Sequence, residues 1–222
     1  MWIVFESRDG SSTLLSEKFG VTYHSKYGAI QESKHVFIRE GLYYKCIGKK
    51  ELNILEMGFG TGLNTFLTSI ESERLGLTVK YTSVENNPVD LETLAKLNYC
   101  EKVGLTNGNC LFNRIHELAW NEWTNLTDKF SLFKKLHSFE EVTFTEPFHL
   151  IYFDAFAPNV QPQLWEVPLL QKMYDALLPK GVLVTYCAKG DFKRALKSVG
   201  FKVESPKGPP GKREMVRATK PR

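Results

Sequence analysis

The chain has 222 residues, 42% of them hydrophobic, and carries 29 lysines and arginines against 25 aspartates and glutamates. This length and apolar content can bury the core of one large domain, so we expect a single domain. The apolar runs are too short for a membrane span and residues 1–10 lack a signal-peptide pattern, so we expect a soluble, cytoplasmic protein. The four cysteines form no CxxC pair or zinc-type cluster, which predicts reduced thiols and no metal site.

The positive charge is concentrated near the C-terminus. Residues 193–222 hold 10 basic and 2 acidic side chains, whereas the preceding residues are neutral to acidic. Such clustering suggests a polyanion as partner, although a solvated basic terminus without a partner fits the charge equally well.

Residues 1–50 are expected to form an extension ahead of the main fold. The segment STLLSEKFGVTYH at residues 12–24 predicts a β-hairpin, and GAIQESKHVFIREGL at residues 28–42 predicts a helix with an apolar face. The remaining residues, 51–222, form the core of the same single domain in this interpretation.

From residue 51 onward, strand patterns alternate with helix patterns. Strands are expected at residues 52–57, 78–85, 148–156 and 181–188. Helices are expected at residues 63–76, 88–100, 164–179 and 191–200. The other segments are less regular. Residues 110–123 look helical, and residues 130–144 look like one or two strands. Residues 201–205 and 214–219 are expected to form a terminal antiparallel hairpin. The alternation predicts an α/β fold with a doubly wound, mostly parallel sheet covered on both faces.

The first core strand leads directly into a glycine-rich segment, EMGFGTGLN, at residues 56–64. Glycines permit a tight turn and let backbone N–H groups approach a ligand at the start of the following helix. A dinucleotide fingerprint needs GxGxxG, but Leu63 stands where the last glycine would be, so the pattern is GxGxG. It resembles motif I of the Rossmann-like class I methyltransferases, which bind S-adenosylmethionine. The candidate cofactor-binding residues of this segment are Glu56, Gly58, Gly60, Gly62 and Asn64.

Two further carboxylates end predicted strands. Glu85 lies where α/β nucleotide-binding folds place an acceptor for ribose hydroxyls, although a surface glutamate at a loop would look the same. Asp154 ends the strand of HLIYFDAFAP, across the cleft from the glycine loop. There it can contact the cofactor and, as a catalytic residue, hold an acceptor amine, while Phe156 can stack on a base. The structural alternative for Asp154 is a helix cap, but the next helix begins too far along the chain.

Several separated motifs resemble one family. The segments DGSSTLLSEKFGVTYHSKYGAIQESKHVFI, ILEMGFGTGLN, IYFDAFAPNVQPQLW, LVTYCAKGDFKRAL and GPPGKREMVRA are similar to the methyltransferase module of the bacterial tRNA 5-methylaminomethyl-2-thiouridine biosynthesis proteins, MnmC and the stand-alone MnmD. The resemblance implies methyl transfer from S-adenosylmethionine to the amine of 5-aminomethyluridine, with or without the 2-thio group, at the tRNA wobble position. Because the chain stops where fused relatives continue, no flavin domain is expected.

The resemblance also implies substrate-binding residues. It assigns Tyr23, His24, Ser25 and Glu32 to the lid or the substrate site, whereas the residues alone indicate a hairpin tip and a solvated helix face. The candidate tRNA contacts near the basic segment are Lys189, Lys212 and Arg213. Fused relatives carry Gly-Asp at the end of the third strand, but this chain has Lys134 and Lys135 nearby, which leaves the adenine contact unassigned.

Two alternatives from other functional classes remain. One is a small-molecule amine methyltransferase or aminopropyltransferase that uses the same fold and an acidic pocket. The other is a catalytically idle RNA-binding relative that keeps the fold and the basic segment. The intact glycine loop with Glu85 and Asp154 speaks against the idle relative, and the basic segment speaks against the small-molecule enzyme.

Overall fold

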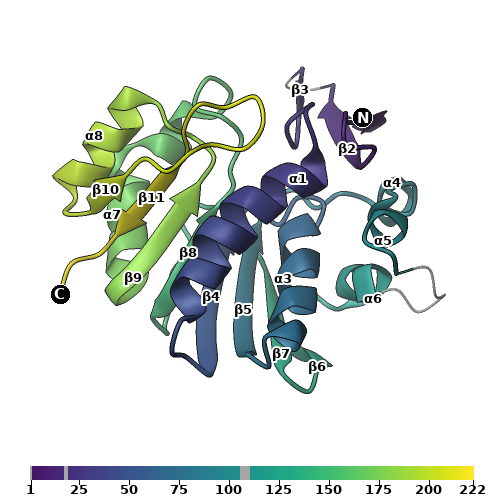
Figure 1. Ribbon diagram of the computed structural model, residues 1–222, viewed down its shortest axis with the longest axis horizontal. Helices are drawn as coiled ribbons and strands as arrows, with labels where there is room; N and C mark the ends of the chain where they lie inside the picture. Colours follow the sequence, from purple (N-terminus) through teal and green to yellow (C-terminus); the bar gives the residue numbers. More distant parts are fainter. Residues whose placement is uncertain (1, 18–19, 106–110) are drawn as a thin grey trace.

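A computed structural model describes residues 2–17, 20–105 and 111–222. Its centre is an eight-stranded sheet with the order β10-β11-β9-β8-β4-β5-β7-β6 (Figure 1). The strands are β4 (Glu51–Met57), β5 (Thr78–Glu85), β6 (Trp123–Thr127), β7 (Phe130–Leu136), β8 (Phe148–Phe153), β9 (Leu177–Thr185), β10 (Lys202–Glu204) and β11 (Val216–Thr219). The predicted α/β class, the mostly parallel sheet and the terminal antiparallel hairpin are confirmed.

The five strands β7, β5, β4, β8 and β9 run parallel, and the remaining strands pair antiparallel at the two edges. In the register, Met57 of β4 lies opposite both Val84 of β5 and Phe153 of β8. The chain builds outward from β4 in one direction and then returns to its other side with β8. The order of the strands therefore reverses between β4 and β8, where ligands bind in such sheets.

Helices cover both faces of this sheet (Figure 1). The helices α3 (Leu63–Arg74) and η1 (Lys34–Tyr43) pack on one face, and α7 (Val167–Ala176) and α8 (Gly190–Ser198) pack on the other. Alternation along β4 follows from the pleat, because successive side chains point to opposite faces. Ile54 belongs to the core under η1 and α3, whereas its neighbour Leu55 belongs to the core under α7 and α8.

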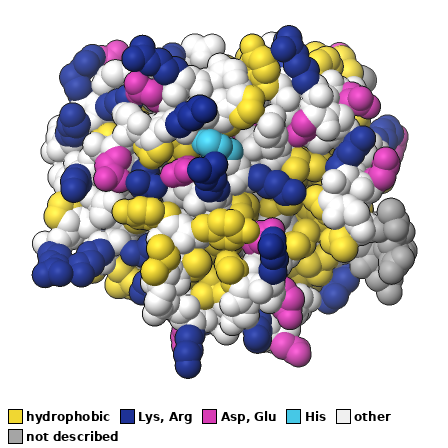
Figure 2. Space-filling view, in the orientation of Figure 1, with side chains coloured by type: hydrophobic (Ala, Val, Ile, Leu, Met, Phe, Trp, Pro, Cys, Tyr) yellow, Lys and Arg dark blue, Asp and Glu magenta, His cyan; other side chains and the backbone are white. Residues whose placement is uncertain are grey.

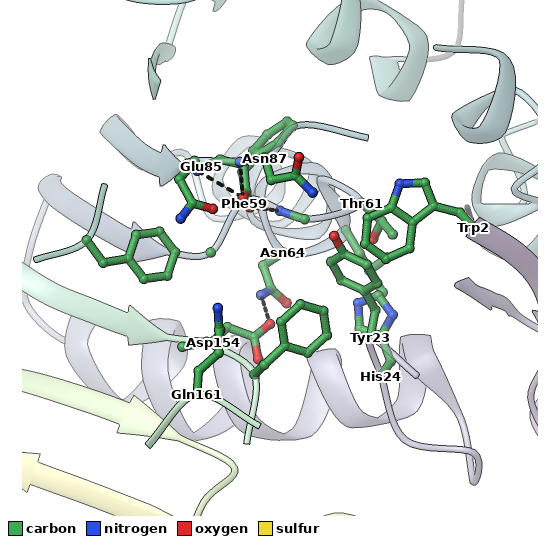
Figure 3. Close-up of a pocket in the computed structure, with 17 residues that line it drawn as sticks. Trp2, Tyr23, His24, Phe59, Thr61, Asn64, Glu85, Asn87, Asp154 and Gln161 are labelled. Carbon is green, nitrogen blue, oxygen red and sulfur yellow. Dashed lines mark hydrogen bonds between the residues drawn. The ribbon is translucent and has the colours of Figure 1, made fainter. Parts of the chain in front are cut away.

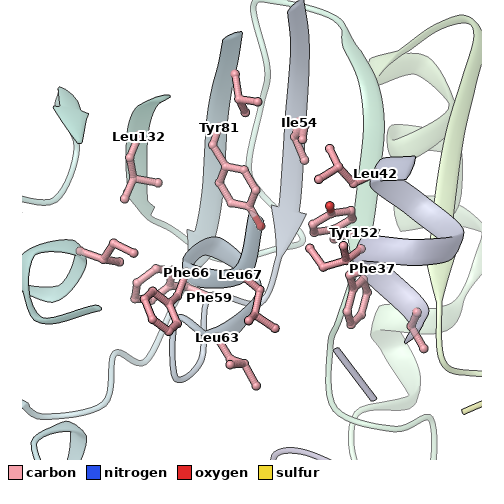
Figure 4. Close-up of a cluster of buried hydrophobic side chains, with 14 of the residues drawn as sticks. Phe37, Leu42, Ile54, Phe59, Leu63, Phe66, Leu67, Tyr81, Leu132 and Tyr152 are labelled. Atoms are coloured by element: carbon pink, nitrogen blue, oxygen red, sulfur yellow. The ribbon is translucent and has the colours of Figure 1, made fainter. Parts of the chain in front are cut away.

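The core on the η1 side is rich in large rings. Figure 4 shows Tyr81 of β5 and Tyr152 of β8, the two strands that flank β4, facing the helices, with Phe37 of η1 beside Tyr152. The ring centroids of Phe37 and Tyr152 are 5.1 Å apart, and those of Tyr81 and Tyr152 are 6.1 Å apart. All three side chains are at most 2% exposed. Their packing anchors the N-terminal extension to the sheet.

The N-terminal extension contains three short strands and a continuous helical segment. The predicted hairpin is present as β2 (Ser12–Ser16) and β3 (Val21–Thr22), and β1 (Trp2–Glu6) adds a third strand. The predicted helix is also present, but it widens after α1 (Ala29–Ser33) into the π-helix η1 and ends in α2 (Tyr44–Cys46). A run of π turns is uncommon and often marks functional sites.

The predicted helix at residues 88–100 is wrong in extent. The structure has two short helices there, α4 (Leu91–Leu94) and α5 (Tyr99–Lys102). Asn98 lies between them, and its side-chain oxygen accepts a hydrogen bond of 2.8 Å from the backbone N–H of Ser12. A tertiary bond to the N-terminal hairpin therefore interrupts the helical pattern.

The helix-like stretch at residues 110–123 is also shorter than expected. The helix α6 (Leu111–Glu117) ends early, and Trp123 begins β6, where it lies opposite Phe133 of β7. The helical pattern at the end of this stretch does not produce a helix, because the edge strand β6 satisfies its backbone hydrogen-bonding groups by pairing with β7. Of the expected strands at 130–144, the structure has one, β7.

Within the described ranges, no helix is long and apolar enough to cross a membrane. No cluster of potential metal ligands occurs in the same residues. Cys46 and Cys187 are free thiols, but Cys100 is disulfide-bonded, so the prediction of reduced thiols is wrong at that residue. Cys110 lies outside the described residues.

The packing of η1 generates a stability prediction at Gly41. An added Cβ there would lie 3.0 Å from Val184 Cγ2 and 3.1 Å from the ring of Tyr152. We expect Gly41→Leu to lower the free energy of unfolding by about 1–3 kcal/mol, because it overpacks the interface between helix and sheet. Arg39→Leu, on the exposed face of the same helix, is the control in denaturant unfolding, and equal stability of the two variants would contradict the prediction.

Candidate cofactor and substrate site

A cavity of about 250 Å³ opens at the carboxyl ends of β4, β5 and β8 (Figure 3). The glycine loop forms one wall, and the N-terminal extension covers the cavity from the opposite side. Its lining residues are Trp2, Tyr23, His24, Gly58, Phe59, Gly60, Thr61, Leu63, Asn64, Glu85, Asn86, Asn87, Phe139, Asp154, Ala155, Phe156 and Gln161. The position is the one at which the strand order reverses, as expected for a ligand site in this fold.

The glycine loop after β4 is held from both sides. The backbone N–H groups of Gly58 and Phe59 donate to the carbonyl oxygen of Val84, at 3.0 and 3.1 Å. Gly58 has a φ of 102°, and an added Cβ would lie 2.6 Å from the carbonyl oxygen of Asp154. Glycine at this position therefore lets the loop touch the end of β8, which brings the loop and Asp154 onto one cavity.

Glu85 connects the end of β5 to the same loop. Its Oε2 accepts from the N–H of Gly60 at 3.0 Å, and its Oε1 accepts from the N–H groups of Asn86 and Asn87, both at 2.9 Å. A carboxylate offers about four lone-pair positions, so these three bonds leave one for another donor. The side chain is 7% exposed and lines the cavity (Figure 3). It can therefore accept a ribose hydroxyl as well as organise the loop.

Glu56 lies below the loop and does not line the cavity. It is fully buried, and its Oε2 accepts hydrogen bonds from Ser83 Oγ at 2.6 Å and Thr65 Oγ1 at 2.9 Å. Burial raises the pKa of Glu56 to about 8. At neutral pH the side chain is therefore mostly protonated, and its observed contacts are with the protein.

Asp154 faces the cavity opposite Glu85 (Figure 3). Asn64, at the start of α3, donates from Nδ2 to Asp154 Oδ2 at 2.8 Å, and Ser33 of α1 in turn donates to Asn64. Burial is the main cause that raises the pKa of Asp154 to about 7, with a further rise from the charge of Glu32. Asp154 can thus change its protonation state near neutral pH, as groups in active sites often do.

The four residues of the N-terminal motif divide into two groups. Tyr23 and His24 line the cavity, and the ring of Tyr23 lies 4.9 Å from that of Phe156. Burial lowers the pKa of His24 to about 4, so the imidazole is neutral at pH 7. Ser25 and Glu32 lie outside the cavity lining, where the backbone N–H of Ser25 donates to Glu32 Oε2 at 2.8 Å.

The three candidate tRNA contacts line a second cavity of about 400 Å³ next to the loop after β8. Lys189 is exposed and Arg213 is 95% exposed, whereas Lys212 turns inward and pairs with Glu32. Figure 2 shows lysine and arginine side chains at the upper left of the molecule, over α8, mixed with acidic ones. Lys189 and Arg213 are therefore open to solvent, whereas the ammonium of Lys212 faces a carboxylate.

Sequence reasoning missed several residues of the first cavity. Asn86 and Asn87 directly follow Glu85, and this adjacency was the available signal. Phe139, in the loop after β7, and Trp2 had no signal in the sequence pattern. Lys134 does not reach the cavity, because it is buried in β7 and donates to the carbonyl oxygen of His116 at 3.0 Å.

The sheet order, the GxGxG loop after β4 and the acidic residue that ends β5 define a class I methyltransferase fold. Residues 126–221 match a family model described as S-adenosyl-L-methionine-dependent methyltransferase. Over these residues, slightly less than half of the chain, it is similar to the S-adenosylmethionine-dependent methyltransferases. The cavity fits this cofactor, because it joins a glycine loop, a carboxylate with a free lone pair and the aromatic rings of Phe59 and Phe139.

Within this class, the chain is similar to the bifunctional MnmC proteins of tRNA 5-methylaminomethyl-2-thiouridine biosynthesis. It is 30% identical to those of Burkholderia mallei (strain SAVP1) and Burkholderia pseudomallei (strain 668), over 92% of this chain. The alignment covers 33% of each of these proteins, so the chain spans about a third of their length. This agrees with the resemblance to the methyltransferase module of MnmC that the sequence motifs indicate.

Solved structures show the same fold. The crystal structure of MnmC2 from Aquifex aeolicus superposes on this chain with a TM-score of 0.79 and 24% sequence identity. The superposition covers 100% of this chain and 72% of the MnmC2 chain. Spermidine synthase from Thermotoga maritima has a TM-score of 0.57 and 14% identity, with 95% of this chain and 69% of that chain covered. The predicted class I methyltransferase architecture is confirmed.

The contacts of Glu85 generate a prediction about cofactor affinity. The free lone pair is expected to accept either the 2′ or the 3′ hydroxyl of the ribose. Removal of that hydroxyl from S-adenosylhomocysteine should then weaken its binding to wild-type protein by about tenfold or more. Glu85→Gln should reduce this ratio, because a neutral amide is a weaker acceptor. Calorimetric titration measures all affinities. Glu92→Gln, at an exposed position, is the control, and an unchanged ratio in Glu85→Gln would exclude the ribose contact.

Proposed function

We propose that this protein methylates the 5-aminomethyl group of uridine or 2-thiouridine at the wobble position of tRNA. The observation that carries the proposal is the position of Asp154. Its carboxylate faces the same cavity as the glycine loop, where an ammonium group can pair with it beside the cofactor. S-adenosylmethionine supplies an electrophilic methyl group on a sulfonium when it is bound.

The acceptor amine must be neutral before it can attack. A primary alkylammonium has a pKa near that of lysine, about 10, so it enters mostly charged. Asp154 attracts the ammonium, orients it with the help of the Asn64 hydrogen bond, and leaves the nitrogen at the cavity wall. Once the proton has left to water or to the carboxylate, positioning of the two reactants supplies most of the remaining rate enhancement.

Support for tRNA as the substrate comes from the relatives and from the surface. The curated relatives are named for tRNA 5-methylaminomethyl-2-thiouridine biosynthesis, and that name describes a methylated amine on a uridine. Lys189 and Arg213 are exposed at the rim of the second cavity and can neutralise phosphates. A tRNA substrate places the enzyme in the cytoplasm in this proposal.

The direct test is mass analysis of tRNA nucleosides. Unmethylated tRNA that carries 5-aminomethyluridines is incubated with the protein and S-adenosylmethionine, then digested. The expected result is conversion of 5-aminomethyl nucleosides into products heavier by one methyl group. Transfer to a polyamine, with no change in tRNA, would instead support the small-molecule amine transferase.

The first prediction of this proposal concerns Asp154→Asn. The amide cannot form an ion pair with the ammonium, so kcat should fall about 100-fold or more, while the affinity for S-adenosylhomocysteine changes little. In wild-type enzyme, kcat/KM should rise with pH up to about 7, because the carboxylate is the active form and its pKa is about 7. That rise should disappear in the variant. Rates within twofold of wild type would contradict the role of Asp154.

The second prediction concerns the basic rim. A variant with both Lys189→Ala and Arg213→Ala should bind tRNA more weakly, and the slope of log affinity against log salt should become shallower by roughly 1 to 2. Binding of S-adenosylhomocysteine should not change. The matched control replaces Lys96 and Lys129, exposed lysines that line neither cavity, with alanine. If the two double variants behave alike, the tRNA contacts lie elsewhere.

A further inference from the structure

An ion pair between two distant segments lies next to the candidate active site. Glu32 of α1 is 6% exposed, and its Oε1 lies 2.6 Å from Lys212 Nζ. Its other oxygen accepts the N–H of Ser25, so both oxygens have a partner. Lys212 Nζ also lies 3.9 Å from the centroid of the Tyr186 ring. The ammonium is therefore held between a buried carboxylate and an aromatic face, which is a favourable arrangement for a cation.

The loop that carries Lys212 is fixed to the N-terminal extension. Gly211 lies against the ring of Tyr27, so closely that an added Cβ would be 2.2 Å from Cε2. On the other side of the turn, His35 Nε2 lies 2.8 Å from the carbonyl oxygen of Lys207. Because both ends of the turn are held, Lys212 is presented by a defined loop rather than by a loose terminus.

The pair borders Asp154. Tyr186, whose ring contacts Lys212, donates from its hydroxyl to the carbonyl oxygen of Ala155 at 2.8 Å. Ala155 directly follows Asp154, so this bond connects the surroundings of Lys212 with Asp154. The charge of Glu32 raises the pKa of Asp154, and the charge of Lys212 lowers it. Two other titratable groups face Asp154, Glu56 and Tyr186, and its charge raises the pKa of each.

Charge balance shows what the pair does. Glu32 and Lys212 cancel each other, so the carboxylate of Asp154 carries the net negative charge of this group. Asp154 has an amide donor, Asn64, but no ion-pair partner among the residues that the structure describes. Without Lys212, Asp154 and Glu32 would be two carboxylates without a cation partner, and Glu32, which lies outside the lining of the cofactor cavity, would attract the substrate ammonium away from that cavity.

We propose that Lys212 is a positioning residue for amine methylation. It forms an ion pair with Glu32 and so directs the substrate ammonium to Asp154. This inference rests on the proposed function for its substrate class. It also explains why a lysine of the basic C-terminal segment turns inward while its neighbour Arg213 stays 95% exposed. The same ammonium lowers the net negative charge around the amine, which favours loss of the amine proton before attack.

Lys212→Met is the first test. Above pH 8 the unpaired Glu32 competes for the ammonium, and this non-productive binding should lower kcat and KM together, by about tenfold. The uncompensated charge of Glu32 should also move the acid limb of kcat/KM to higher pH, by about one unit. Lys212→Arg keeps the charge and should restore both quantities. Lys96→Met, which breaks an exposed ion pair with Glu92, is the matched control and should change neither.

The double variant Glu32→Gln/Lys212→Met separates charge from structure. If Lys212 acts by occupying Glu32, removal of both charges should return kcat, KM and the acid limb toward wild type, as a double-mutant cycle reveals. Glu32→Gln alone leaves an unpaired ammonium beside the amine, so it should raise KM and move the acid limb to lower pH. A double variant as impaired as Lys212→Met would show that the pair is only a structural link, and the inference would be wrong.

A measurement without turnover keeps this inference distinct from the proposed function. The pKa of Asp154, followed by NMR of its carboxyl carbon with S-adenosylhomocysteine bound, should rise in Lys212→Met, fall in Glu32→Gln and return in the double variant. If wild-type protein does not methylate tRNA, the proposed function fails whatever these values are. If wild type is active but Lys212→Met raises KM alone and makes the salt dependence of tRNA binding shallower, Lys212 is a phosphate contact and this inference fails alone.

Discussion

The site depends on the contact between the glycine loop and the ends of the two strands that flank β4. Gly58 donates to the end of β5 and lies so close to the backbone of Asp154 that any side chain at position 58 would collide with it. Glu85 then holds the loop from the β5 side through Gly60. The glycine loop and the carboxylate of Asp154 therefore share one cavity because three parallel strands end at the same level.

Buried charge is the second constraint on the site. Glu56, Glu32 and Asp154 all lie in or near the region where β4 and β8 end, and an unpaired charge there has a high desolvation cost. Each carboxyl group meets that cost differently. Burial raises the pKa of Glu56 to about 8, Glu32 pairs with Lys212, and Asp154, with a pKa of about 7, has no ion-pair partner among the residues that the structure describes. Of these three groups, only Asp154 lines the cofactor cavity.

Short-range patterns of apolar and polar residues predicted much of the fold. Continuous apolar strands alternate with amphipathic helices, so the strands around residues 52–57, 78–85 and 148–156 could be found from the pattern of apolar and polar residues alone. The ends of such strands meet at one edge of the sheet, which is why Glu85 and Asp154 stood out. The predicted helix at residues 88–100 was wrong because Asn98 bonds to a hairpin 86 residues earlier, and no local pattern carries that contact.

The sequence by itself determined a mostly parallel α/β fold, the glycine loop and the two carboxylates at strand ends, because these follow from residue spacing and from the alternation of strands and helices; the resemblance of its motifs to known ones added the class I methyltransferase fold. Only the tertiary structure decided which way the charged side chains turn. Glu56 lies under the loop instead of in the cavity, and Lys212 pairs with a glutamate 180 residues away instead of facing solvent. Such choices depend on burial and on partners from distant segments, so they exist only once the chain has folded.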